Sequence, residues 1–291
     1  MGWTPEAFNP VPVELGWPEC RYYVPWLFAN ECHAACPYCM IGPEPTKYMP
    51  RQWSDVQAIR AWEQFYDDYG SAVLVFGGRE PGHQLPLVGR ILKHHYGTVV
   101  TNFTFDSQVL YRTCEPFRLI LNPSFHARLW HKDIEPFLAK ALDVRKHGYR
   151  VPVVSMACWP PDFPLIPGWK AEAERVGIEV NVHPLYNVEY QGRRLPDGYT
   201  DEERAQMAQW VGSCYDDRLG MAKERRIACA AGHAAGAVNA DGRFVRCVQT
   251  LEPMGDFMGG EHVRFWDEPR PCDVEHCWCT NMNGYHIMEA V

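Results

Sequence analysis

Three closely spaced cysteines are the chemically most informative feature of this 291-residue chain. Cys32, Cys36 and Cys39 form a C-x3-C-x2-C array within the segment 30–41. Thiolates bind zinc and iron–sulfur clusters, and three thiolates on a four-iron cluster leave one iron open to an outside ligand. A structural zinc site takes four protein ligands, so His33 or a distant cysteine would have to complete it. The array therefore predicts a cluster with an open iron, with a zinc site or three buried thiols as the alternatives.

The array resembles the signature of the radical S-adenosylmethionine (SAM) enzymes, including the aromatic Tyr38 just before the third cysteine. In that family the open iron binds the amino and carboxylate groups of SAM. Reductive cleavage of the sulfonium then releases a 5'-deoxyadenosyl radical, which abstracts a hydrogen atom from the substrate. The resemblance implies that Cys32, Cys36 and Cys39 hold the catalytic [4Fe-4S] cluster and that Tyr38 lies in the cofactor site. It also implies an external electron donor such as flavodoxin or ferredoxin.

A glycine motif, Gly77-Gly78-Arg79-Glu80-Pro81, follows the apolar run 72–76. Two glycines let a ligand approach the backbone, and a carboxylate can receive an ammonium group. On its own the motif is more typical of a glycine turn with a surface glutamate. The radical SAM family has a G-G-x-E-P motif in this position, which contacts the methionyl amino group. The resemblance therefore assigns Gly77, Gly78 and Glu80 to SAM.

Strand and helix patterns alternate along the chain. We expect strands at 21–28, 72–76, 98–102, 118–124, 149–156 and 178–183, and helices at 54–69, 86–96, 107–114, 134–147, 169–176 and from Thr200. Such alternation implies a parallel sheet with right-handed crossovers. We therefore predict an α/β fold, a partial (β/α)6 barrel with a small C-terminal cysteine-rich extension that carries an auxiliary cluster. The expected units are a lead-in at 1–20, the barrel at 21–213 and the extension at 214–291.

Several polar residues lie where the predicted strands end, which is where ligands bind in parallel sheets. Asn102, Ser124 and His183 end the third, fourth and sixth strands. The family often has polar side chains there that reach the methionyl carboxylate or the ribose, so we assign these three residues to SAM binding, with strand-end capping as the alternative. Other rim residues are candidates for substrate binding or proton transfer. They are His126, Arg128, Tyr186, Glu189, Tyr190 and Arg193.

A second set of cysteines lies in the carboxyl-terminal region. Cys229 and Cys247 flank an Asp-Gly turn at 241–242, which predicts a hairpin of strands 236–240 and 243–248. Cys272, Cys277 and Cys279 follow. Four thiolates saturate a four-iron cluster, and a four-cysteine zinc site is the alternative.

The spacing of Cys229, Gly242 and Cys247 resembles the first part of the SPASM and twitch extensions of radical SAM enzymes. A full SPASM extension needs seven cysteines, whereas five are available here. The resemblance implies one auxiliary [4Fe-4S] cluster, held by Cys229, Cys247 and two of the three cysteines 272, 277 and 279. The spacing does not select which of these three is spare.

Composition limits the partners. A formal charge of −8 and a pI near 5.8 argue against nucleic acid. Residues 1–19 have no signal-peptide pattern, and no apolar run is long enough to span a bilayer, so we expect no membrane partner. Cysteines without a secretory signal favour the cytoplasm. The cysteines outside the two sets are expected to be buried thiols: Cys20, Cys114, Cys158 and Cys214.

An auxiliary cluster near the substrate radical can accept its electron, which makes the overall reaction a two-electron oxidation. We predict oxidation of a small molecule, because Cys32 lies too close to the start for a peptide-recognition domain to precede it. One alternative is a peptide or protein maturase that uses the same chemistry for crosslinking, oxidation or epimerisation. The other is a non-catalytic zinc or iron–sulfur scaffold.

Overall fold

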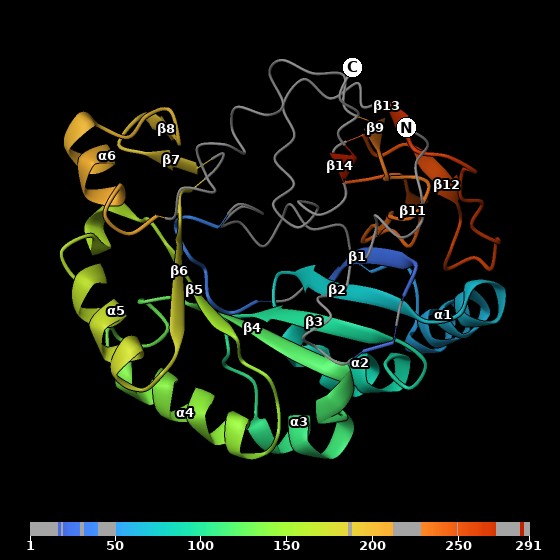
Figure 1. Ribbon diagram of the computed structural model, residues 1–291, viewed down its shortest axis with the longest axis horizontal. Coiled ribbons are helices and arrows are strands. Elements are labelled where there is room, and N and C mark those ends of the chain that lie inside the picture. The colour runs from blue at the N-terminus through green and yellow to red at the C-terminus, as the bar shows by residue number, and fades with distance from the viewer. Residues whose placement is uncertain are drawn as a thin grey trace.

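The structure is a computed structural model that describes residues 17–18, 20–29, 32–39, 51–185, 188–211, 228–248, 250–271 and 286–287. Six parallel strands lie side by side in chain order and form most of the main sheet (Figure 1). They are β1 (Tyr22–Ala29), β2 (Ala72–Gly78), β3 (Tyr96–Thr101), β4 (Leu119–Phe125), β5 (Val153–Ala157) and β6 (Glu179–His183).

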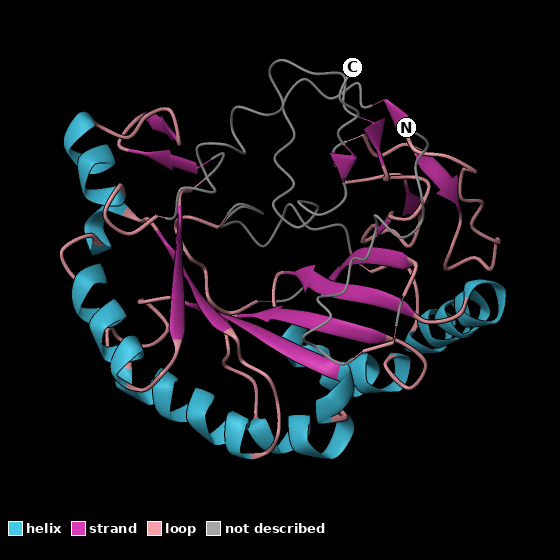
Figure 2. Ribbon diagram, in the orientation of Figure 1, coloured by secondary structure: helices cyan, strands magenta, loops and turns pink. Residues whose placement is uncertain are grey.

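Helices connect these strands and cover the outer side of the curved sheet (Figure 2). They are α1 (Asp55–Tyr69), α2 (Leu85–Ile91), α3 (Ser107–Thr113), α4 (Glu135–Lys146) and α5 (Ile166–Arg175), with short 3-10 turns at Pro81–Gln84, Pro116–Arg118 and Pro160–Asp162. The order of elements and the parallel register confirm the predicted α/β partial barrel.

Helix α1 illustrates how the local sequence specifies the elements. Ser54 accepts a hydrogen bond from the Gln57 backbone and the Gln57 side chain accepts one from Ser54, so the two form a capping box. Trp62 and Phe65 lie on the buried face of the helix. Gly70 ends it with φ of 75°, a left-handed conformation that favours glycine. Capping and the apolar stripe together fix which face of α1 meets the sheet.

Alternate residues of each strand point to opposite faces of the sheet. One set, exemplified by Trp26, Leu74 and Phe76, packs under the helices in the main hydrophobic core. The opposite set, exemplified by Tyr23 and Val75, faces the concave side and packs with apolar residues at 229–235. The base of the concave face is therefore filled with apolar side chains.

The second expected helix is wrong at its carboxyl end. The sequence pattern predicts a helix to residue 96 closed by Gly97, whereas α2 ends at Ile91 and Gly97 lies inside β3. A Cβ atom on Gly97 would lie 2.8 Å from the Phe76 ring and 2.9 Å from the Leu74 carbonyl oxygen. This glycine therefore serves close strand packing and not helix termination.

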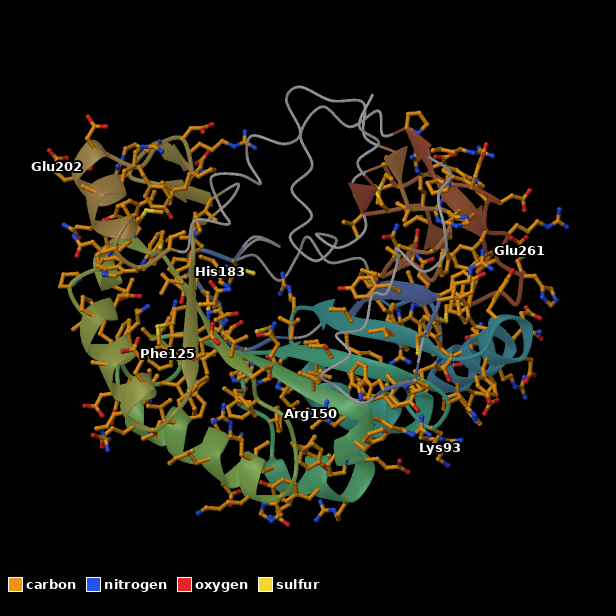
Figure 3. The ribbon with its side chains drawn as sticks, viewed as in Figure 1. Lys93, Phe125, Arg150, His183, Glu202 and Glu261 are labelled. Carbon is orange, nitrogen blue, oxygen red and sulfur yellow. The ribbon has the colours of Figure 1, made fainter. Side chains whose placement is uncertain are left out.

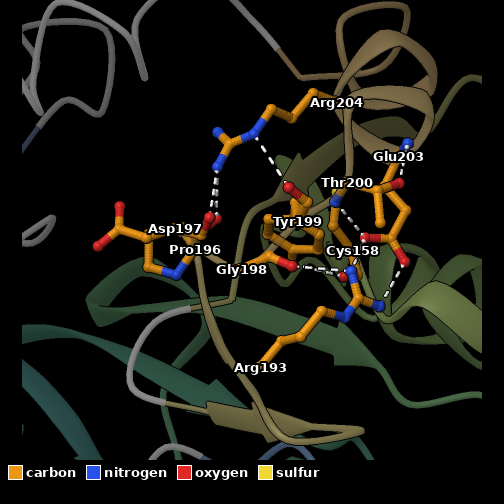
Figure 4. Close-up of polar contacts among 9 residues, drawn as sticks. All are labelled: Cys158, Arg193, Pro196, Asp197, Gly198, Tyr199, Thr200, Glu203 and Arg204. Carbon is orange, nitrogen blue, oxygen red and sulfur yellow. Dashed lines mark hydrogen bonds and ion pairs between the residues drawn. The ribbon is translucent and has the colours of Figure 1, made fainter.

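A small antiparallel pair, β7 (Val188–Tyr190) and β8 (Arg193–Leu195), follows β6 and was not expected from the sequence. It leads into α6 (Asp201–Met207), which begins with the predicted capping box of Thr200 and Glu203. Glu203 also forms two hydrogen bonds to the Arg193 guanidinium, at 2.7 and 3.0 Å (Figure 4). One carboxylate thus joins β8 to the first turn of α6.

The carboxyl-terminal segment continues the main sheet. Strand β10 (Ala237–Val238) pairs parallel to β1, and β11 (Phe244–Val245) and β12 (Pro253–Gly255) follow it in antiparallel order. The predicted hairpin around Gly242 is confirmed, because β10 and β11 pair across that turn. A separate three-stranded sheet contains β9 (Ala228–Cys229), β13 (Arg270–Pro271) and β14 (His286–Ile287). The unit boundaries expected at residues 20 and 213 stay predictions.

We find no helix in the described part of the chain with the length and apolar character needed to cross a membrane.

Candidate active site

The three-cysteine loop directly follows β1 at the carboxyl edge of the sheet. Cys36 is buried, and Cys32 and Cys39 are half-buried. The Cys39 amide donates a hydrogen bond to the Cys36 carbonyl oxygen at 3.1 Å, and Arg128 from the loop after β4 donates to the Ala35 carbonyl oxygen at 2.9 Å. These bonds hold the array as a compact turn and tie it to the neighbouring part of the barrel.

Two thiols of this loop, those of Cys32 and Cys36, are hard to ionise in the protein alone. Burial raises the pKa of the Cys32 thiol, and burial together with the nearby Cys32 and Cys39 raises the pKa of Cys36 to about 12. A cationic metal centre would reverse this, because metal binding displaces the thiol protons. In the described residues no three His, Cys, Asp or Glu side chains converge on one point as a single ion requires. The thiolates of a cluster bind different irons and have no need to converge in this way.

Backbone amides point at the sulfur atoms of three predicted ligands. The backbone amide of Ala34 donates to Cys32 Sγ at 3.4 Å. In the same way, the backbone amide of Ala231 donates to Cys229 Sγ at 3.5 Å. Thr250 donates from its amide to Cys247 Sγ at 3.4 Å, and its hydroxyl lies 3.5 Å from the same sulfur. Donors of this kind stabilise a thiolate, which is the form that binds metals.

Two of the cysteines that we expect to be buried thiols donate a hydrogen bond from sulfur to a backbone carbonyl oxygen. Cys20 Sγ lies 3.4 Å from the Pro18 carbonyl oxygen, and Cys114 Sγ lies 3.5 Å from the Leu85 carbonyl oxygen. A carbonyl oxygen accepts the S–H hydrogen of a neutral thiol and repels a thiolate. Cys20 and Cys114 therefore differ in their hydrogen bonding from Cys32, Cys229 and Cys247, and the division of the cysteines into two classes stays a prediction.

Glu80 joins the ends of β2 and β3. Its side chain is fully buried, and its carboxylate accepts hydrogen bonds from the Gly82 amide at 2.8 Å, the Asn102 amide at 2.6 Å and the Thr101 hydroxyl. Burial raises the pKa of Glu80, an effect that these three donors oppose. A carboxylate has about four acceptor positions, so one remains for a further donor such as an ammonium group. The described geometry thus leaves the predicted role of Glu80 chemically feasible.

Asn102 brings the glycine motif and the cysteine loop together. Its backbone amide binds Glu80, and its side-chain Nδ2 lies 3.6 Å from Cys32 Sγ. Its Oδ1 accepts hydrogen bonds from the amide and the hydroxyl of Thr104, at 3.0 and 2.6 Å, which orients the Nδ2 group. Residues from the ends of β1, β2 and β3 therefore form one continuous polar site.

Gly77 and Gly78 lie at the end of β2 opposite residues 27 and 29 of β1. Both are half-buried, and Gly78 has φ of 111°, which other residues rarely adopt. The strand end therefore keeps an accessible backbone beside the cysteine loop.

Tyr38 turns towards the fourth strand. Its hydroxyl lies 3.2 Å from Nδ1 of His126, and its ring packs against Trp159, which in turn contacts Tyr190. Burial lowers the pKa of His126 to about 4, so the imidazole is neutral near pH 7. An aromatic row thus runs from the cysteine loop to the β7–β8 pair. The cofactor role of Tyr38 stays a prediction.

A polar row crosses the concave face of β4, β5 and β6. Ser155 Oγ lies 3.4 Å from Asn122 Oδ1 and 3.3 Å from His183 Nε2 (His183 is labelled in Figure 3). Ser124 is level with Ser155 in the pairing of β4 with β5. The two predicted cofactor residues, Ser124 and His183, therefore face the same interior as two residues that sequence reasoning missed.

The missed residues have a recognisable signal. Asn122 and Ser155 interrupt otherwise apolar strands at positions that alternate with fully buried residues such as Leu121 and Val154. When every second residue of a strand is polar and the residues between them are buried, the polar residues lie on the inward side of the barrel.

Some predicted site residues lie outside the described residues. These are Cys272, Cys277, Cys279 and Tyr186, and also the expected thiol Cys214. Of the remaining rim residues, Glu189 is exposed and Arg193 is used by Glu203.

Comparison with known proteins gives matches in structure alone. No protein-family model and no curated protein matches the chain. Among solved structures, hexahistidine-tagged anSMEcpe with bound AdoMet (SAM) aligns with a TM-score of 0.57 at 12% identity, over 81% of this chain and 78% of that chain. This chain has the fold of a radical SAM enzyme.

Two further structures of that protein support the fold assignment. Native anSMEcpe with bound AdoMet and Kp18Cys peptide aligns with a TM-score of 0.56, at 12% identity, over 81% of this chain and 78% of that chain. The same protein with AdoMet and Cp18Cys peptide gives 0.54, at 12% identity and 81% and 77% coverage. At this identity the radical SAM likeness describes the course of the backbone, so the chemistry has to be argued from the residues of this chain.

Proposed function

We propose that this chain is a radical SAM enzyme. The observation that carries the proposal is the contact of Asn102 with both Glu80 and Cys32, which unites three separately predicted motifs at the carboxyl ends of β1, β2 and β3. A four-iron cluster bound here together with SAM would supply a 5'-deoxyadenosyl radical. The groups that would bind these cofactors come from segments far apart in the sequence.

Each residue has a defined task in this proposal. Cys32, Cys36 and Cys39 hold the catalytic cluster, and the Asn102 amide group and the Ala34 backbone amide donate hydrogen bonds to Cys32. The remaining acceptor position of Glu80 receives the methionyl ammonium group beside Gly77 and Gly78. The other cofactor contacts are assigned to Tyr38, Asn102, Ser124 and His183.

A second cluster is assigned to Cys229, Cys247 and two of the cysteines 272, 277 and 279. The amides directed at Cys229 and Cys247 support a thiolate site there. An auxiliary cluster would let the enzyme remove two electrons from its substrate, so we propose an oxidation. The external electron donor would be a small redox protein such as flavodoxin or ferredoxin.

A small polar molecule is our first choice of substrate. Asn122 and Ser155, which lie beside the cofactor residue His183, offer amide and hydroxyl groups inside the barrel that can bind hydroxyl or carboxyl groups of a small molecule. A peptide or protein substrate is the second candidate, because the solved relative with this fold was obtained with a Kp18Cys peptide bound.

Anaerobic reconstitution tests the chemistry. We expect about eight irons per chain as two four-iron clusters, and 5'-deoxyadenosine on addition of dithionite and SAM. Cys36→Ala should abolish SAM cleavage, whereas Cys229→Ala should lower the iron content to about four. Cys114→Ser is the matched control, because its hydroxyl can still donate to Leu85, and it should keep both clusters. Zinc in place of iron, or intact clusters without SAM cleavage, would refute the proposal and favour a scaffold.

Deuterium transfer distinguishes the two substrate classes. Hydrogen abstraction from a deuterated substrate carbon places deuterium in 5'-deoxyadenosine. Deuterated small-molecule and peptide fractions from cells grown in heavy water would be supplied separately with SAM and dithionite. Mass spectrometry of 5'-deoxyadenosine identifies the fraction that contains the substrate. Deuterium from the peptide fraction alone would replace the small-molecule assignment with that of a maturase.

A further inference from the structure

Arg246 is the only Lys or Arg in the described residues whose side chain is buried, at 5% exposure. It directly follows β11 and directly precedes Cys247. Burying a guanidinium costs free energy unless anionic partners or hydrogen bonds compensate for the lost water. The surroundings of this residue therefore indicate what the region is built to hold.

The Arg246 guanidinium connects the segments that carry the candidate auxiliary ligands. Its Nε donates to the Ala231 carbonyl oxygen at 3.3 Å, and its Nη2 donates to the Pro271 carbonyl oxygen at 3.0 Å. Ala231 in turn donates its own amide to Cys229 Sγ at 3.5 Å. One side chain thus anchors Ala231, which lies two residues after Cys229, and is bonded through the backbone to Cys247.

The positive charge of Arg246 is only weakly balanced by the described residues around it. The nearest carboxylate oxygen, from Glu252, is 3.6 Å away on a side chain that is 50% exposed to solvent. The guanidinium carbon lies 4.6 Å from the centre of the Trp266 ring, and that of Arg270 lies 4.0 Å from the same ring. Two cations on one indole repel each other, so an anion nearby would stabilise the arrangement.

A four-iron cluster with four thiolates is such an anion, and it gains one more negative charge on reduction. A buried cation stabilises the reduced form more than the oxidised form, and net charge and hydrogen bonds are the levers that set cluster potentials. Arg246 supplies the charge, and its bond to the Ala231 carbonyl oxygen anchors the residue whose own amide points at Cys229 Sγ.

We propose that Arg246 is a positioning residue of the auxiliary cluster, which holds the Cys229 and Cys247 segments together and raises the reduction potential of the cluster. This inference rests on the auxiliary cluster assigned under the proposed function. A higher potential would suit a cluster that accepts an electron from a substrate radical.

The test isolates the auxiliary cluster in a Cys36→Ala background, in which the catalytic cluster is lost. Redox titration followed by electron paramagnetic resonance then measures one midpoint potential. We expect Arg246→Gln to raise the ratio of oxidised to reduced cluster about tenfold at a fixed potential, which is a decrease of about 59 mV for one electron. Arg246→Lys keeps the charge but not the two directed hydrogen bonds, so it should shift the ratio by less.

Arg270→Gln is the matched control, because Arg270 contacts the same Trp266 ring but is exposed to solvent. It should change the ratio less than threefold, since water screens its charge. An Arg246→Gln potential equal to that of the parent, with iron retained, would overturn the proposal. If Arg246→Gln loses the iron, retention by Arg246→Lys supports the role of the charge, and loss in both overturns it. A Cys36→Ala parent without iron would instead refute the auxiliary cluster itself.

Discussion

Glu80 combines a structural task with its proposed contact to the cofactor. Three of its acceptor positions bind protein donors from the segment after β2 and from the end of β3. Gly82 is required for this arrangement, because a Cβ atom there would lie 2.5 Å from Glu80 Oε1 and 2.7 Å from the Phe105 ring. A carboxylate that is already fixed by the protein needs little reorganisation to receive an ammonium group.

Glu80→Gln should lower the free energy of unfolding by about 1–3 kcal/mol. Glutamine has one acceptor oxygen and one NH2 group, so its NH2 would face the amide of Gly82 or of Asn102, both of which are donors. Denaturant unfolding of the anaerobically purified protein measures the difference. Because glutamine is neutral and has fewer acceptor positions for the methionyl ammonium group, we also expect SAM affinity, measured by equilibrium dialysis, to fall about tenfold.

Glu115→Gln is the control for this substitution. Glu115 pairs with Arg118 on the surface, and its side chain is 73% exposed, so its loss should change the unfolding free energy by less than about 0.5 kcal/mol. Equal stability of Glu80→Gln and Glu115→Gln would show that the buried hydrogen bonds contribute nothing, which contradicts the geometry.

The β7–β8 pair and α6 form one element through a small set of polar contacts. Arg193 donates to Glu203 and to the Gly198 carbonyl oxygen, and Arg204 donates to the carbonyl oxygens of Pro196 and Asp197 (Figure 4). Trp159 meets Tyr190 at the edge of this element, so its position bears on the interior of the barrel.

Glu203→Ala should destabilise the protein by about 1–2 kcal/mol, because it removes both the two-bonded ion pair and half of the capping box. The hydrogen bonds from Arg193 lower the pKa of Glu203 below its ordinary value of 4.5. A lowered pKa means that the stabilisation is fully present above pH 4.5 and is lost as the pH falls through the lower value. Unfolding at about pH 7 and about pH 6 should therefore give the same difference from the parent.

Glu202→Ala, in the same first turn but exposed (labelled in Figure 3), is the control for Glu203→Ala. It keeps the capping box and should change stability by less than about 0.5 kcal/mol. A Glu202→Ala effect as large as that of Glu203→Ala would assign the stabilisation to the helix dipole and not to the Arg193 pair.

Sequence reasoning located the barrel elements because each of them has a strong local signal. The six strands are apolar runs bounded by glycine or polar residues, and the Ser54 and Thr200 caps mark helix starts that the structure confirms. The β7–β8 pair escaped prediction since its three-residue strands contain charged residues and have no period. The predicted end of the second helix was wrong because a glycine within a strand, such as Gly97, cannot be told in the sequence from a glycine that ends a helix.

The site was predictable in its residue types but not in its contacts. The cysteine spacing and the glycine motif pointed to Cys32 and Glu80, whereas the Asn102 side chain that touches Cys32 depends on the register of β1, β2 and β3. Arg246 gave no sequence signal, because a single arginine before a cysteine is common and its burial follows from tertiary packing.

At the scale of the whole molecule, the C-terminal region is bound to the barrel and does not simply follow it. Trp53 donates to the Ala240 carbonyl oxygen at 3.0 Å, and β10 pairs with the edge of β1. Phe244 of β11 is fully buried and meets the ring of Phe65 from α1. The ring fits because Gly236 has no Cβ, which would otherwise collide with it.

Phe244→Ala should therefore destabilise the barrel and the C-terminal region together, by about 3–5 kcal/mol. Far-UV circular dichroism reports the barrel, since α1 to α6 all precede residue 208, and the absorbance of an auxiliary cluster reports the C-terminal region. Both signals should move to lower denaturant concentration and keep a common midpoint. Phe117→Ala is the control, because Phe117 is 51% exposed. It should shift neither unfolding midpoint by more than the equivalent of about 1 kcal/mol. The cluster absorbance could instead be lost at a lower denaturant concentration while the circular dichroism midpoint stays at that of the parent. That result would mean that the two parts unfold independently.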